Sequence, residues 1–115
     1  MIEPILTDIR DAVDKELRRA EQHESIFRSP HEGYGVLKEE MEEMLDEAGR
    51  ANRDLADMWF ACIRKDLPVT EDALSQMELN AMRTAAEAIQ VAAMARKYGY
   101  SQSLWLVGTY EKKKG

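Results

Sequence analysis

Apolar residues recur at three- and four-residue spacing along most of this chain, and little interrupts that helical period. From Pro4 to about Glu24 the apolar positions follow it, with charged residues filling the remaining positions. Only three prolines and six glycines are present, and almost nowhere does the sequence alternate as strands do. The pattern therefore predicts an all-α protein, a small antiparallel helical bundle.

A second helix has a clear start signal. Ser29 is the expected N-cap, Pro30 takes the first helical position, and Glu32 lies three residues after the cap, which together form a capping box. The helix is predicted to run to about Ala48. The pattern leaves open whether it breaks at 49–52 or continues to about residue 66.

The last long helix is predicted from about Glu71 to Tyr98. Thr70 precedes it as an N-cap, and Gly99 follows it as the expected stop. Residues 100–115 then form a tail. Its apolar part is expected to dock on the body or on a neighbouring subunit, and its last lysines to be solvated.

Length and charge narrow the functional classes. The 115 residues suit one domain, 1–115, and 22 acidic against 16 basic residues disfavour nucleic acid as a partner. The longest apolar runs fall far short of the roughly 20 residues that span a bilayer. We expect no signal segment, because charged residues interrupt the apolar residues at the N-terminus. Cys62, the single cysteine, rules out an intrachain disulfide and is expected to be a buried small hydrophobe. We expect a soluble, cytoplasmic protein.

Six acidic residues occupy nine positions at 39–47, and helical geometry separates them. At about 100° per residue, Glu43 lies about 60° and Glu47 about 20° from Glu40, whereas Glu42 points to the opposite side. Glu40 itself lies at the centre of an apolar stripe, formed by Val36, Leu37 and Met44. An unpaired charge in that position is costly. Protonation, pairing with a basic side chain, or a bound cation would each relieve it.

The last helix contains a second unusual segment. Between Ala85 and Ala95 only Glu87 and Gln90 are polar, and they are three residues apart, hence on one face. A segment this apolar is usually buried on most sides, so both side chains should face inward or across an interface. They could form a hydrogen-bonded pair between helices. Together with the Glu40 face they favour a cation, and oxygen ligands suit Mg²⁺ or Mn²⁺.

These two segments resemble a known family. The run 31–43, HEGYGVLKEEMEE, followed by EAIQVAAMA at 87–95, is similar to the MazG-like all-α nucleoside triphosphate pyrophosphohydrolases, in particular to the small proteins of phages and prophages. The resemblance covers residues 31–98. It implies hydrolysis of nucleoside triphosphates to monophosphate and pyrophosphate with Mg²⁺, in a bundle completed by oligomerisation as a homodimer or homotetramer.

The resemblance also assigns roles to particular residues. Glu39, Glu40 and Glu43 match the family's first acidic motif and Glu87 the first acid of its second, whereas Gln90 stands where the family has Asp. The separation between the motifs is longer than usual. The metal ligands would then be Glu40, Glu43, Glu87 and Gln90.

Hydrolysis of a nucleoside triphosphate also needs groups that activate water and that bind phosphates. Glu39 or Glu47 would orient or deprotonate the attacking water, and Arg83 and Lys97 would contact phosphates. A different class of function also fits the sequence: a non-catalytic helical module that oligomerises or binds a nucleotide without turnover. The apolar segment 85–95 and the tail, with Trp105, predict a homo-oligomer for either function.

Overall fold

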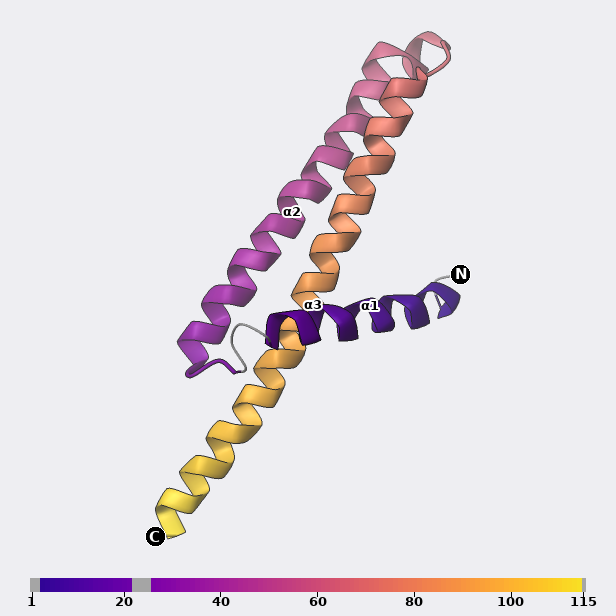
Figure 1. The fold of residues 1–115 in the computed structure, drawn as a ribbon. Helices are drawn as coiled ribbons and strands as arrows, with labels where there is room; N and C mark the ends of the chain where they lie inside the picture. Colours follow the sequence, from indigo (N-terminus) through magenta and orange to yellow (C-terminus); the bar gives the residue numbers. More distant parts are fainter. Residues whose placement is uncertain (1–2, 22–25, 115) are drawn as a thin grey trace. The chain divides into compact units, whose positions relative to one another are not determined.

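The computed structural model describes the backbone of residues 3–21 and 26–114, and the side chains of residues 3–19 and 26–107. Within these ranges the chain forms α1 (Glu3–Glu21), α2 (Pro30–Ala61), a short 3-10 helix η1 (Ile63–Lys65) and α3 (Glu71–Lys114), and no strand (Figure 1). The predicted all-α class is confirmed. The expected end of the first helix near Glu24 and the solvated side chains of the last lysines lie outside the described residues.

Side-chain caps set the starts of the two long helices. The Ser29 hydroxyl accepts the backbone N–H of Glu32 at 3.2 Å, and the Thr70 hydroxyl accepts that of Ala73, also at 3.2 Å. The Glu32 carboxylate accepts the N–H of Arg28 at 3.3 Å, one residue earlier than a capping box predicts. Both predicted N-caps are therefore confirmed, and only the return bond from Glu32 differs.

Helix α2 continues through 49–52 without a break, so the region is one helix up to Ala61. The short helix η1 follows it. Asp66 then adopts a left-handed backbone conformation, with φ 56°, and the chain turns there into the loop before α3. The large side chains at this end lie at the surface, with Trp59 53% and Phe60 59% exposed. The prediction that Cys62 is buried is wrong: its side chain is half-buried and lines a cavity together with Met58 and Val69.

Helix α3 passes Gly99 and extends to Lys114, so the predicted stop at Gly99 is wrong. The reason is the packing of α3 against a residue far away in the chain. Tyr98, Ser101 and Trp105 lie on one face of α3, and all three contact Phe27. The indole N–H of Trp105 donates to the Phe27 carbonyl at 2.8 Å. Continuing the helix brings these partners together, whereas a turn at Gly99 would separate them.

The chain divides into two compact units, 1–40 with 89–115 and 41–88. The buried apolar side chains among the described residues are Val13, Phe27 and Ala93, and all three belong to the first unit. Two polar links join α1 to α3 there: Arg96 forms an ion pair with Asp14, and Gln90 bonds to Glu16. The second unit is the hairpin of α2 and α3.

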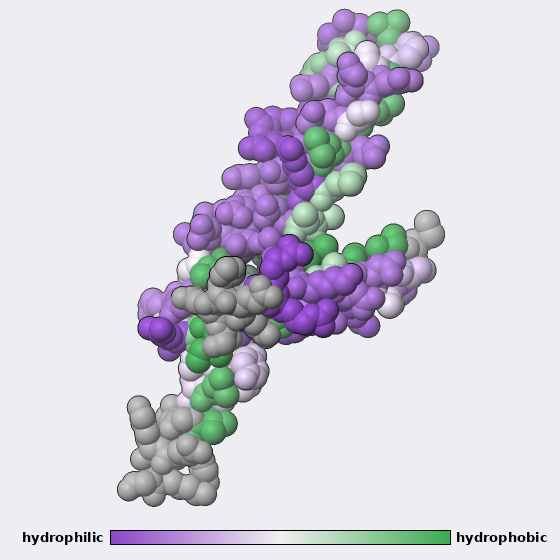
Figure 2. All heavy atoms as spheres, in the orientation of Figure 1, coloured by the Kyte–Doolittle hydropathy of each residue, from purple (hydrophilic) through white to green (hydrophobic). Residues whose placement is uncertain are grey.

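The alanine-rich part of α3 is only partly covered by the described residues. Ala85, Ala86, Ala92 and Ala95 are exposed, so the expectation that 85–95 is buried on most sides is not met by the described residues. Figure 2 shows hydrophilic side chains over much of α2 on the visible face, with hydrophobic surface at the hairpin end. In the described part of the chain, none of the helices has the length and apolar character to cross a membrane.

Candidate metal centre

A stripe of mixed apolar and acidic residues on α2 faces α3 within the hairpin 41–88. Its half-buried positions follow alternating spacings of three and four residues and are Met44, Glu47, Ala51, Asp54 and Met58. The opposing stripe of α3 consists of Ala73, Met77, Asn80, Thr84 and Glu87. Carboxylates therefore lie on the packed face of each helix, Glu47 and Asp54 on α2 and Glu87 on α3. An apolar residue would ordinarily lie at such positions.

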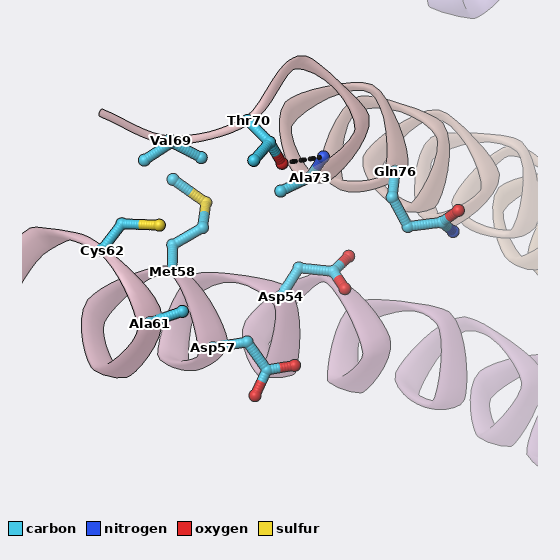
Figure 3. A pocket seen from close by; sticks show the side chains of 9 residues that line it. All are labelled: Asp54, Asp57, Met58, Ala61, Cys62, Val69, Thr70, Ala73 and Gln76. Carbon is cyan, nitrogen blue, oxygen red and sulfur yellow. Dashed lines mark hydrogen bonds between the residues drawn. The ribbon is translucent and has the colours of Figure 1, made fainter. Parts of the chain in front are cut away.

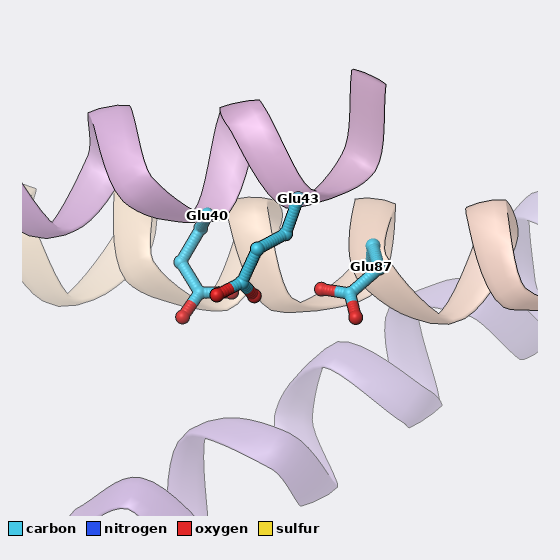
Figure 4. Close-up of side chains that lie close together, drawn as sticks. All are labelled: Glu40, Glu43 and Glu87. Atoms are coloured by element: carbon cyan, nitrogen blue, oxygen red, sulfur yellow. The ribbon is translucent and has the colours of Figure 1, made fainter. Parts of the chain in front are cut away.

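Three carboxylates come together near Glu87. One oxygen each from Glu40, Glu43 and Glu87 lies within 4.8 Å of the others (Figure 4). Glu40 and Glu43 lie one turn apart on the continuous helix α2, and Glu87 comes from α3. Glu40 and Glu87 are half-buried and Glu43 is exposed. The structure therefore brings together three of the four residues named as metal ligands from the sequence.

The electrostatics of this cluster centre on Glu87. Partial burial raises the pKa of the Glu87 carboxyl above its ordinary value, and the neighbouring charge of Glu43, a hydrogen bond with it, and the charge of Glu47 raise it further. Oε2 of Glu87 and Oε2 of the neighbouring Glu47 are buried and have no hydrogen-bond partner. A proton or a cation would relieve this repulsion.

The two candidate general bases differ in their surroundings. Glu47 is half-buried and close enough to Glu87 to raise its pKa. Its Oε1 also forms an ion pair with Arg50 at 3.3 Å. Glu39, next to Glu40 in the chain, is exposed. Sequence reasoning overlooked Arg50, although its position three residues after Glu47 on a helix was the available signal.

Gln90 has a partner that the sequence did not indicate. Its amide nitrogen donates to Oε1 of Glu16 on α1 at 3.3 Å. Both helices show the required amphipathic period, but the period carries no information on which positions of α1 meet α3. The role of Gln90 as a metal ligand stays a prediction.

The two residues predicted to contact phosphates, Arg83 and Lys97, differ in their exposure to solvent. Arg83 is exposed and lies four residues before Glu87, hence on the same side of α3. Lys97 is buried, with its ammonium 4.5 Å from the centre of the Phe27 ring, a cation–π contact. This ammonium already has an intramolecular partner, so binding a phosphate would require it to leave the ring.

The hairpin holds a second polar group beside a cavity. Asn80 is buried and donates to Oδ2 of Asp54 at 2.7 Å, while Gln76 donates to the Asn80 side-chain oxygen at 3.3 Å. Next to this group lies a cavity of about 250 Å³, toward which Met58 and Val69 extend from opposite sides (Figure 3). Its size is below the usual range for ligand pockets. Three of its polar lining residues, Asp54, Thr70 and Gln76, already form hydrogen bonds.

Comparison of the chain with models of protein families, with curated proteins and with solved structures finds no match.

Proposed function

We propose that this protein is an Mg²⁺-dependent nucleoside triphosphate pyrophosphohydrolase, which converts a nucleoside triphosphate and water to the monophosphate and pyrophosphate. The observation that carries the proposal is the convergence of Glu40, Glu43 and Glu87 from two helices. Three carboxylates at this separation repel one another, and a divalent cation would neutralise that repulsion.

The residues present suit a hard cation. All three are oxygen donors, as Mg²⁺ and Mn²⁺ prefer, and Oε2 of Glu87 is a buried acceptor without a hydrogen bond. Glu40, Glu43 and Glu87 would hold the ion, and the Gln90 carbonyl oxygen would be a neutral fourth donor. Bound Mg²⁺ supplies positive charge that offsets the charge of the phosphates.

The chain's own residues supply the remaining functions. Glu47, held by Arg50, would orient the attacking water and accept its proton, with Glu39 as the exposed alternative. Attack of that water breaks the bond between the α- and β-phosphoryl groups and releases pyrophosphate. Arg83 would contact the phosphates from the Glu87 side of α3, and Lys97 would do so after leaving Phe27. The biological setting that we propose is control of nucleotide pools in the cytoplasm of a bacterium or of a phage-infected cell.

Pyrophosphate release across a panel of ribo- and deoxyribonucleoside triphosphates tests the proposal. Activity should require Mg²⁺ or Mn²⁺ and should fall at least 100-fold in Glu43→Gln and Glu87→Gln. The matched control is Glu42→Gln, which removes the same charge from an exposed position on α2 and should retain activity. Absence of metal-dependent pyrophosphate release from every nucleotide would overturn the proposal.

A non-catalytic nucleotide-binding module is the second candidate, and one observation favours it. Gln90 replaces an acid in the resembled motif, and its amide is bonded to Glu16. Binding of a nucleotide and Mg²⁺ in a calorimeter, without pyrophosphate release, would support this candidate over the hydrolase.

A further inference from the structure

The cavity of about 250 Å³ lies where α2 ends and α3 begins, inside the hairpin 41–88 (Figure 3). Asp54, Met58 and Cys62 line it at four-residue spacing, which places them on one side of α2. Val69 lines it from the loop and Ala73 from the first turn of α3. The space exceeds that of one water molecule and lies below the range of pockets for drug-sized ligands. It therefore suits a ligand of only a few non-hydrogen atoms.

The two ends of this cavity differ in polarity. In Figure 3 the carboxylate of Asp54 and the amide of Gln76 lie at one end, and the side chains of Met58, Cys62 and Val69 lie at the other. The described residues that line it include two carboxylates but no lysine, arginine or histidine. The cavity is thus amphipathic, with an apolar end and a negatively charged end.

The carboxylate of Asp54 retains the capacity to bind a cation. Its Oδ2 accepts the Asn80 amide at 2.7 Å, and the carboxylate forms no ion pair within residues 3–19 and 26–107. The side chain is half-buried, so water screens its charge less than at an exposed position. Gln76 donates to Asn80 through its amide nitrogen, which leaves its carbonyl oxygen as a second acceptor.

The kind of cation follows from the remaining lining. The group of acidic side chains that could hold a metal ion in the described chain is Glu40, Glu43 and Glu87, and neither Asp54 nor Asp57 belongs to one. A metal ion is therefore disfavoured in the cavity. An alkyl ammonium donates charge-assisted hydrogen bonds to one or two oxygens, and its hydrocarbon part lies along apolar side chains. This combination matches both ends of the cavity.

We propose that this cavity binds a small aliphatic amine in its ammonium form, with the charged nitrogen on Asp54 and the alkyl chain between Met58 and Val69. The proposal is independent of the proposed function, because it concerns none of the predicted metal ligands, general bases or phosphate contacts.

Methyl chemical shifts in NMR measure binding to the full wild-type chain. The probe is n-butylammonium, which is protonated at neutral pH as a lysine side chain is. Butan-1-ol and butyrate have the same alkyl chain with a neutral or a negative head group. Butylammonium should shift the Met58 and Val69 methyl resonances at concentrations on the order of millimolar. Butanol should bind at least about 10-fold more weakly, and butyrate should cause no shift.

Sodium chloride at matched ionic strength is the blank, so that screening of surface charges does not imitate binding. Equal affinity for the three probes would show a void without charge selectivity. The absence of any shift with butylammonium would show that the cavity takes no amine. Either result overturns the proposal.

A pair of charge variants tests the role of Asp54. Asp54→Asn keeps the shape of the side chain and removes its charge, so butylammonium should bind at least about 10-fold more weakly. Asp46→Asn removes the same charge from an exposed position of α2 outside the cavity and should bind as the wild type does. Equal affinities of the two variants would contradict the proposal. Should Asp54→Asn fail to fold, the comparison of head groups on the wild type still decides.

A second pair of variants tests the location. Ala73→Leu should occupy the cavity and abolish binding, because the Ala73 side chain lines it. Ala81→Leu makes the same change at an exposed position of α3 outside the cavity, and should leave the affinity unchanged. Circular dichroism confirms that both variants are helical. Undiminished binding in a folded Ala73→Leu would place the amine elsewhere and overturn the proposal.

Cys62 gives a readout that needs no variant, because it is the only cysteine of the chain. Its half-buried side chain lines the cavity, so bound butylammonium should slow alkylation of the thiol by neutral iodoacetamide. Free cysteine under the same conditions controls for an effect on the reagent. An unchanged rate at a concentration that saturates the methyl shifts would contradict binding in this cavity.

Discussion

The backbone N–H of Phe27 donates to the hydroxyl of Ser101 at 2.8 Å, although 74 residues separate the two. Ser101 has no exposed surface, and its hydroxyl donates in turn to the Lys97 carbonyl at 2.8 Å. The neighbouring carbonyl of Phe27 accepts the Trp105 indole N–H. Side chains of α3 thus satisfy both backbone groups of a buried loop residue, which would otherwise cost free energy.

Ser101→Ala should lower the free energy of unfolding by about 1–3 kcal/mol, because it leaves the buried Phe27 N–H without an acceptor. Urea denaturation followed by circular dichroism measures the change. Ser103→Ala is the matched control: Ser103 is exposed and bonds only to the Gly99 carbonyl of its own helix. Its effect should stay within about 0.5 kcal/mol. Equal losses in the two variants would contradict the assigned role of Ser101.

Two glycines of α2 should respond oppositely to alanine. A Cβ at Gly33 would overlap the Tyr98 ring and lie 3.2 Å from Phe27, so Gly33→Ala should destabilise by about 1–3 kcal/mol. A Cβ at Gly35 meets nothing within 4 Å, so Gly35→Ala should stabilise by about 0.5–1 kcal/mol through helix propensity. Thermal melts of both variants check the signs, and a stabilising Gly33→Ala would show that Tyr98 does not occupy this contact.

Asn80→Ala should destabilise the hairpin by about 1–3 kcal/mol, since it removes the buried amide that donates to Asp54. Gln76→Ala, which removes an exposed partner of the same network and leaves the Asn80–Asp54 bond in place, should cost less. Hydrogen exchange along α2 and α3 would show the loss of protection. A larger effect from Gln76→Ala would contradict the central position of Asn80.

Stability should fall as pH rises across the range in which Glu87 ionises. The folded state raises the pKa of this carboxyl above its ordinary value of 4.5. Between the ordinary and the raised pKa the folded state binds more protons than the unfolded one, so the free energy of unfolding decreases with pH. Glu87→Gln should flatten this dependence in denaturation series at several pH values. Glu78→Gln, an exposed charge on the same helix, controls for net charge and should leave the slope nearly as in the wild type.

Mg²⁺ or Mn²⁺ should raise the melting temperature of the wild-type protein, because a ligand of the folded state alone stabilises it by linkage. Glu40→Gln should strongly reduce that increase. Glu42→Gln, two residues further and exposed, should leave the increase nearly unchanged. Differential scanning fluorimetry over a metal titration gives the comparison, and equal increases in both variants would argue against a site at Glu40.

Part of the candidate site was predictable because helical period is a local property. The position of Glu40 within an apolar stripe, and of Glu87 within an apolar segment, identified two carboxylates on packed faces, and the structure brings both together with Glu43. The caps at Ser29 and Thr70 were predictable for the same reason, since each side chain bonds to a backbone group three residues away.

The sequence by itself determined the helical class, the starts of α2 and α3, and which face of each helix carries acids. Only the tertiary structure decided that α3 passes Gly99, that Gln90 bonds to Glu16, and that the Lys97 ammonium lies on Phe27. Each of these depends on groups far apart in the chain. Glycine favours the end of a helix but does not force it. Here contacts with Phe27 favour continuation, because its buried backbone N–H and carbonyl have their partners on the next turns of α3.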